Sequence, residues 1–309
     1  MPKNSIEEYV PINGISQYCL HLPNGSKDVV IMLHGGPGLA NSYLAYYQQP
    51  YFDFCNAVYY DQRGAGKTQL KNNTQPEDLS LDILLEDLKQ TIAYVKQKYK
   101  TDRVFLAGHS WGSMLGTEYI RKYPQDVAGY IGYGQVVADA TQSRSWYEQL
   151  KAAVVKSGEE EDIKKLRSVD TNFPSIARED YFDAYFSLGE LGLKYDFAAN
   201  DISEIYGNSP IWTPEDELQV SHIEQLNKKL YEEVLFGYDI RDVKAYQTPI
   251  YYVLGRQDEM TSSTLAAEYF ETITAPKKGL YWIENAGHLV DTDNPSAFFR
   301  IVKEILPQV

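Results

Sequence analysis

Four short runs of almost continuous apolar residues recur along the chain, and each one ends in glycine or polar residues. Strands that are buried on both faces of a parallel sheet have this pattern, whereas half-exposed strands alternate apolar and polar positions. The runs therefore predict a parallel sheet. They are "DVVIMLHGG" (28–36), "VFLAGHS" (104–110), "VAGYIGYG" (127–134) and "PIYYVLG" (249–255).

Two further patterns complete the predicted sheet. Between the first two runs, apolar residues recur at three- and four-residue steps over positions 81–99, which predicts a helix covering one face. Before them, residues 7–26 contain two alternating segments around Asn13-Gly14, a strong signal for a hairpin. We therefore expect an α/β protein with an antiparallel edge before the parallel strands.

The pattern changes between residues 135 and 245, where charged helical stretches replace the buried strands. Strand and helix signals then resume and end in "PSAFFRIVKEILPQV". We predict that residues 1–134 and 246–309 form one core, a mostly parallel central sheet with helices on both faces. Residues 135–245 are expected to be an inserted helical cap.

Composition narrows the possible partners and cofactors. The formal charge of −14 disfavours nucleic acid and anionic membranes as partners, because both would be repelled. Cys19 and Cys55 are too few and too isolated for a disulfide framework or a zinc site. The sequence shows neither a secretory signal nor a long apolar span. We expect a cytoplasmic protein without metal or organic cofactor, whose oligomeric state the sequence leaves open.

The stretch "DQRGAGKTQL" (61–70) ends like a nucleotide-binding P-loop. A P-loop requires glycine at the first position, where this chain has Asp61, a carboxylate that would face the phosphates. The residues after Thr68 also lack the pattern of a good amphipathic helix. We therefore exclude nucleotide binding and assign no role to Lys67 or Thr68.

A stronger catalytic signal lies at Gly108-His109-Ser110-Trp111-Gly112, which matches G-x-S-x-G between a predicted strand and a predicted helix. That context makes a nucleophile elbow, a sharp turn that presents the serine hydroxyl at a helix N-terminus. Ser110 is therefore the candidate nucleophile.

A serine nucleophile needs a histidine base and an acidic residue that orients it. Of five histidines, His288 is the best candidate base, because it follows a late strand signal, "GLYWIE", in a loop. The other four are His21, His34, His109 and His222, which lie in the hairpin, a glycine loop, the elbow and the cap.

The acidic partner is expected between the serine and the histidine in chain order. Asp258 follows the buried strand "PIYYVL", and its neighbour Glu259 is the competitor. For the oxyanion hole, one donor is expected to be the backbone N–H of Trp111. The second is assigned to Gly36 in "HGGPG", because the glycines let the backbone approach a ligand closely.

Three motifs in order, "HGGPG" (34–38), "DQRGAGKT" (61–68) and "GHSWG" (108–112), resemble the proline iminopeptidase (prolyl aminopeptidase) family of α/β-hydrolases. The resemblance implies the α/β-hydrolase fold, a triad of Ser110, Asp258 and His288, and an oxyanion hole near Gly36 and Trp111.

The resemblance also implies roles outside the triad. Asp61 and Arg63 would form a mostly buried ion pair or hydrogen-bond network that braces the "HGGPG" loop, and Thr68 replaces the usual serine. The family holds a substrate's free amine with cap glutamates. "REDYFDAYF" (178–186) is loosely similar to one such stretch, with Glu179 as candidate, although its spacing is one residue short and a solvated helix face explains it equally well.

These features predict a serine hydrolase that cleaves an N-terminal residue, proline or another, from short peptides or amino-acid amides through an acyl-enzyme. A small-molecule carboxylesterase of the same fold is the alternative, and a non-catalytic ligand-binding member is the alternative from another class. The substrate-binding residues of the cap stay unassigned.

Overall fold

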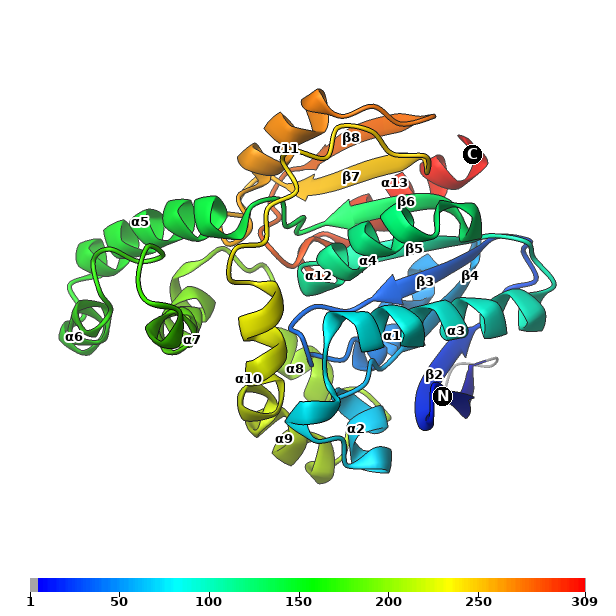
Figure 1. Cartoon of the computed structure of the whole chain (residues 1–309), viewed down its shortest axis with the longest axis horizontal. Helices are drawn as coiled ribbons and strands as arrows, with labels where there is room; N and C mark the ends of the chain where they lie inside the picture. The colour runs from blue at the N-terminus through cyan, green and yellow to red at the C-terminus, as the bar shows by residue number, and fades with distance from the viewer. Residues whose placement is uncertain (1–4, 309) are drawn as a thin grey trace.

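Eight strands form one sheet in the order β1-β2-β4-β3-β5-β6-β7-β8 (Figure 1). The structure is a computed structural model that describes residues 5–308, except for the side chains of Glu179, Glu190, Leu193 and Gln308. The first two neighbouring pairs are antiparallel and the others parallel, as the sequence predicts. The strands are β1 (Ile6–Ile12), β2 (Ile15–Leu22), β3 (Val29–Leu33), β4 (Asn56–Tyr60), β5 (Val104–His109), β6 (Val127–Tyr133), β7 (Ile250–Gly255) and β8 (Lys278–Ile283).

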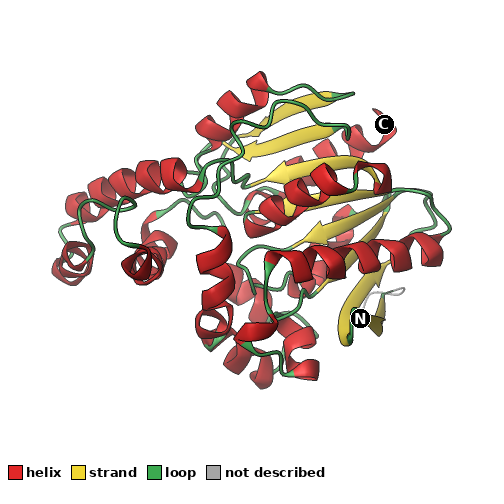
Figure 2. Ribbon diagram, viewed as in Figure 1, coloured by secondary structure: helices red, strands yellow, loops and turns green. Residues whose placement is uncertain are grey.

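Helices lie on both faces of the sheet, and a helical insertion extends beyond its strand ends (Figure 2). The core contributes α1 (Ala45–Gln48), α2 (Gly66–Asn72), α3 (Leu81–Tyr99), α4 (Trp111–Lys122), α11 (Ser263–Thr272), α12 (Val290–Asp293) and α13 (Pro295–Ile305). Between β6 and β7 follow α5 (Asp139–Ser157), α6 (Glu160–Ser168), α7 (Arg178–Tyr195), α8 (Ile202–Gly207), α9 (Pro214–Ser221) and α10 (Ile223–Val234).

Two apolar cores, one on each face, explain why the central strands have no polar alternation. Along β3, Ile31 packs on the side of α3, α4 and α11, while Val30 and Met32 pack on the side of α13. All five residues of β3 are buried. Successive side chains of a strand point to opposite faces, so a sheet covered on both faces requires apolar residues at every position.

The helical cap packs as two parts. Helices α5, α6 and α7 share a separate small core that includes Trp146, Leu150 and Phe173. Helix α10, by contrast, inserts Leu230 and Val234 into the main core. In Figure 1 the first group projects far past the carboxyl ends of the strands, while α10 lies closer to the strands.

The "DQRG" region corrects one sequence prediction, because a short helix, α2, does begin at Gly66. The buried carboxylate of Asp61 accepts the backbone N–H of Lys67 at 2.8 Å, so the protein's own anion occupies the start of this helix. A Cβ at position 66 would lie 2.4 Å from Asp61 Oδ2, which is why glycine is required there. Burial raises the pKa of Asp61 to about 7, although the hydrogen bond from the backbone N–H of Lys67 opposes the shift.

The expected pairing of Asp61 with Arg63 is wrong. Arg63 instead forms a bidentate ion pair with Asp87 of α3, at 2.8 and 2.9 Å, and also donates to the carbonyl of Asn13. The guanidinium points to the hairpin turn because Asn13 and Asp87 supply three acceptors there. Arg63 therefore fastens the hairpin to α3 and does not brace the "HGGPG" loop.

Lys67 and Thr68 also have roles that the sequence did not reveal. The Thr68 hydroxyl donates to the carbonyl of Asp61 at 2.7 Å and accepts the N–H of Tyr18 at 2.9 Å. The Lys67 ammonium pairs with Asp216 of α9, whose carboxylate is fully buried and also accepts the hydroxyl of Tyr43 at 2.8 Å. The Lys67–Asp216 pair therefore joins the core to the helical cap.

We expect Lys67→Met to lower the free energy of unfolding by about 3 kcal/mol, because it leaves the buried Asp216 carboxylate without its cation. Urea unfolding at pH 7 measures the change. Lys122→Met is the matched control, since Lys122 pairs with Asp82 on the surface and its loss should change the free energy by less than about 1 kcal/mol. Equal effects of the two substitutions would show that the Lys67–Asp216 pair is not a buried link.

Candidate active site

Ser110 stands at a strained turn between β5 and α4, with φ 51° and ψ −119°. Such a backbone conformation is costly for a residue with a side chain and is found where surrounding structure enforces it. Here the turn packs directly on the end of β3, because a Cβ at Gly112 would lie 2.2 Å from the carbonyl oxygen of Leu33. The N–H of Ser110 donates to the carbonyl of Tyr133 at 3.2 Å. The geometry is that of a nucleophile elbow.

Asp258 and His288 form a hydrogen-bonded pair at the same edge of the sheet. Asp258 follows β7, His288 follows β8, and His288 Nδ1 lies 3.2 Å from Asp258 Oδ2. Thr261 also holds the carboxylate: its hydroxyl, which lies 3.3 Å from His288 Nδ1, donates to Oδ2 at 2.8 Å, and its N–H donates to Oδ1 at 3.0 Å. Glu259, the competing acid, instead accepts a hydrogen bond from Gln149 in the cap.

Asp258 and His288 each stabilise the charged form of the other. Burial alone would raise the pKa of Asp258, but the charge of His288 and the hydrogen bonds from His288 and Thr261 lower it overall. Burial alone would lower the pKa of His288, but the Asp258 carboxylate raises it overall. An ionised aspartate therefore favours the protonated imidazole, which a general base must become during catalysis.

The other histidines have different surroundings. His109 lies against His288, with ring centroids 4.7 Å apart, and its Nε2 bonds to the carbonyl of His288 at 2.9 Å. Burial, followed by the proximity of His288, lowers the pKa of His109 to about 3, so its ring is neutral at pH 7. His34 is fully buried in the "HGGPG" loop, His21 lies in the hairpin, and His222 lies between α9 and α10.

Gln62, a residue that sequence reasoning missed, connects the loops around the serine. Its N–H donates to His34 Nε2 at 3.0 Å, and its side-chain amide donates to the carbonyl of His34 at 3.2 Å. Its side-chain oxygen accepts the indole N–H of Trp111 at 2.9 Å. Gln62, and not Arg63, thus braces the "HGGPG" loop. The sequence signal for Gln62 was its place in the "DQRG" motif, but no local pattern showed which polar side chain of that motif turns inward.

A small closed pocket lies over Ser110. Gly36, Trp111 and Thr261 line it from the core, and Asp139 lines it from α5 of the cap. Its volume of about 20 Å³ accommodates about one water molecule. Any larger substrate therefore requires the cap helices to move.

Asp139 is a second residue that the sequence did not reveal, although its position after the carboxyl end of β6 was a usable signal. Asp139 is 6% exposed, and its carboxylate accepts a hydrogen bond from the hydroxyl of Tyr181. Burial raises its pKa to about 7, and hydrogen bonds from Tyr181 and Ser143 oppose the shift. The pocket of Ser110 thus contains an acidic group that titrates near neutral pH.

Of the site residues expected from the sequence, Ser110, Gly36 and Trp111 line one pocket. Asp258 and His288 are joined by a hydrogen bond. Within residues 5–308, no hydrogen bond joins the hydroxyl of Ser110 to His288. Catalytic hydrogen bonds are often long in unliganded enzymes and shorten in the substrate complex.

Glu179, the loosely matched cap residue, lies in the first turn of α7, but its side chain is outside the described part of the chain.

The described residues contain no cluster of His, Cys, Asp and Glu side chains suited to holding a metal ion. In the same part of the chain, no helix combines the length and apolar character needed to cross a bilayer.

A family model described as the alpha/beta hydrolase fold matches residues 28–295. The chain therefore belongs to the α/β hydrolase fold family. A proline iminopeptidase from Saccharolobus solfataricus is 25% identical over 333 aligned positions, which cover 99% of this chain and 94% of the relative. This similarity confirms the resemblance to proline iminopeptidases and supports hydrolase activity.

Solved structures of the same fold differ in their reactions. A proline iminopeptidase-related protein from Thermus thermophilus aligns with a TM-score of 0.65 and 21% identity over 98% of both chains. Potato epoxide hydrolase I aligns with a TM-score of 0.62 and 16% identity, covering 99% of this chain and 100% of that one. At these identities the likeness shows the fold alone, so the reaction must be inferred from the site.

We expect Asp258→Asn to lower the pKa of His288, because it removes the negative charge that opposes the effect of burial. The pKa of His288 in the folded protein lies above its value of about 6.5 in the unfolded chain. The Asp258–His288 pair therefore contributes its full stabilisation to the wild type at pH values below the unfolded pKa. That stability is lost as pH rises through the folded pKa. NMR titration of the His288 imidazole measures the shift, and Glu259→Gln is the control that should leave it unchanged. An unaltered titration in Asp258→Asn would contradict the pairing.

Proposed function

We propose that this chain is a serine hydrolase that removes the N-terminal residue from short peptides or amino-acid amides. The observation that carries the proposal is the strained elbow of Ser110, which lines a closed pocket beside a buried Asp–His pair. A buried aspartate paired with histidine is the arrangement that orients an imidazole and stabilises its charged form. No other histidine in residues 5–308 bonds to a buried aspartate.

In the proposed mechanism, His288 Nε2 takes the hydroxyl proton of Ser110 as the oxygen attacks the scissile carbonyl carbon. Asp258 holds the imidazolium through Nδ1. His288 then returns the proton to the leaving amine, and the C–N bond breaks to give an acyl-enzyme. Water, deprotonated by His288, releases the acyl group and restores Ser110.

The oxyanion of the tetrahedral intermediates would be held by the backbone N–H groups of Gly36 and Trp111, which both line the pocket. Trp111 begins α4, so its N–H points out of a helix N-terminus, where the helix dipole favours negative charge. Each such donor contributes about 3–4 kcal/mol of transition-state stabilisation in serine hydrolases. Gln62 supports both donors through its bonds to Trp111 and to the loop that holds Gly36.

Asp139 favours a substrate with a free amine over a simple ester. It supplies a buried carboxylate in the pocket that contains Ser110. A protonated α-amine entering this pocket would ionise Asp139 and pair with it, whereas an uncharged ester would leave the carboxyl unmatched. The similarity to proline iminopeptidases supports the same class of substrate.

We expect Ser110→Ala to abolish labelling by a fluorophosphonate probe and to reduce kcat by at least about 10⁴-fold. Ser143→Ala is the matched control, because Ser143 lines the same pocket outside the elbow and should leave labelling intact. Wild-type protein that folds but takes no label would favour a non-catalytic ligand-binding protein. The measurement is mass spectrometry of the labelled residue.

We expect Asp139→Asn to raise KM at least about tenfold for proline, alanine and leucine chromogenic amides with free amines, because it removes the anionic partner. Turnover of short nitrophenyl esters without an amine should change little. Asp183→Asn is the control, since Asp183 is an exposed cap carboxylate paired with Lys228. Wild-type turnover of the esters alone would instead establish a carboxylesterase.

A further inference from the structure

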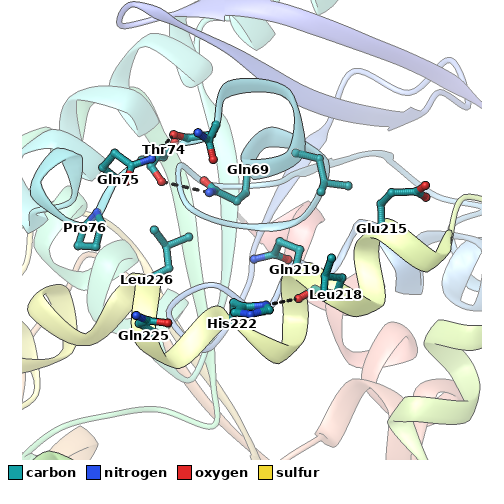
Figure 3. Close-up of a pocket in the computed structure, with 12 residues that line it drawn as sticks. Gln69, Thr74, Gln75, Pro76, Glu215, Leu218, Gln219, His222, Gln225 and Leu226 are labelled. Carbon is teal, nitrogen blue, oxygen red and sulfur yellow. Dashed lines mark hydrogen bonds between the residues drawn. The ribbon is translucent and has the colours of Figure 1, made fainter.

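A second and larger cavity lies away from Ser110, at the seam between core and helical cap. This groove, of about 490 Å³, runs between the end of α2 with the turn after it and the helices α9 and α10 (Figure 3). Its lining shares no residue with the pocket over Ser110. The proposed hydrolytic mechanism therefore makes no use of it.

Polar atoms without partners converge on this groove. In the described structure, both amide atoms of Gln219, the side-chain oxygen of Gln69 and the hydroxyl of Thr74 have no hydrogen-bond partner. Thr74 is 5% and Gln219 8% exposed. Figure 3 shows Gln69 and Thr74 on one wall and Gln219 on the other. Buried polar groups normally find partners, so these atoms are available to a ligand that supplies both donors and acceptors.

The orientation of Gln69 is fixed by the protein itself. Its amide N–H donates to the carbonyl of Thr74 at 3.1 Å, which leaves its oxygen as an acceptor for another group. Gln219, from the facing helix, offers both a donor and an acceptor. Gln219 therefore presents the complement of a peptide group on one wall, and Gln69 adds an acceptor on the other.

The charges of the groove exclude anionic ligands. Glu215 is its one carboxylate, and neither lysine nor arginine is among its described lining residues. A phosphate or a carboxylate would meet neither a lysine nor an arginine there and would be repelled by Glu215. The ligand therefore carries no negative charge where it enters the groove.

The apolar part of the lining favours a peptide over a sugar. Leu70 and Leu218 are 42% and 62% exposed, and Leu226 and Pro76 also line the groove. The one aromatic ring among the described lining residues is the imidazole of His222, and no Phe, Tyr or Trp ring offers a broad platform on which a sugar could stack. Aliphatic side chains next to carboxamides match an extended peptide, which alternates polar backbone with side chains.

We propose that this groove binds a short, uncharged stretch of extended peptide with aliphatic side chains. The backbone N–H and C=O groups of the peptide pair with Gln219 and Gln69, and one aliphatic side chain packs on Leu70 and Leu218. The site is independent of hydrolysis at Ser110. Because the ligand touches both core and cap, its binding holds α9 and α10 against the core.

The test uses the full chain with Ser110→Ala, so that no probe is consumed, and N-acetyl-Leu-Gly-Leu-amide, which has neither a free amine nor a carboxylate. We expect saturable binding by isothermal titration calorimetry and an increase in Tm with probe concentration. Gln219→Leu should weaken binding about tenfold, because it removes the paired carboxamide. Gln97→Leu is the matched control, since Gln97 is an exposed glutamine of α3 far from the lining.

Leu218→Ser is a second variant that keeps the fold, because Leu218 is mostly exposed, and it should weaken binding as well. The proposal is overturned if the peptide does not bind to folded protein, or if it binds equally to Gln219→Leu, Leu218→Ser and the control. Saturable binding of methyl glucoside or inorganic phosphate in place of the peptide would also overturn it. These outcomes are read without activity and are separate from any failure of the hydrolase proposal.

Discussion

The hydrogen bonds of Gln62 are the constraint on which the geometry around Ser110 depends. This one residue, at the end of β4, bonds to the loop after β3 and to the first residue of the helix after β5. Three loops that meet only at the sheet edge are thereby fixed relative to one another. A strained backbone conformation persists only where the surrounding structure enforces it. The hydrogen bonds of Gln62 enforce the conformation of the turn at Ser110.

Local patterns predicted the frame of the molecule well. Continuous apolar runs identified central strands because a sheet covered on both faces demands them, and Asn13-Gly14 marked the hairpin because its residues have positive φ. The nucleophile elbow was recognisable because close contacts require glycine at both ends of the turn: Gly108 packs against Gly112, and Gly112 packs against Leu33 of β3. The partnership of Asp258 with His288 followed from chain order and from the carboxyl edge of the sheet, which topology fixes.

The side-chain partners around this frame were not predictable in the same way. Lys67 reaches a partner 149 positions away, and no local pattern records such a contact. Arg63 was assigned to its neighbour Asp61, yet three acceptors at the hairpin turn hold it instead. Asp139 is the first residue of α5. Its burial beside Ser110 emerges only when the cap folds over the sheet edge.

The insertion of the cap between β6 and β7 also has a consequence for biosynthesis. These strands are neighbours in the sheet, with Tyr130 opposite Ile250, although the whole helical insertion separates them in the chain. During synthesis β6 therefore remains an unpaired edge until the cap has been made and β7 follows it. Unpaired edges invite association with other chains, so the length of the insertion sets how long the unfinished sheet is exposed to aggregation.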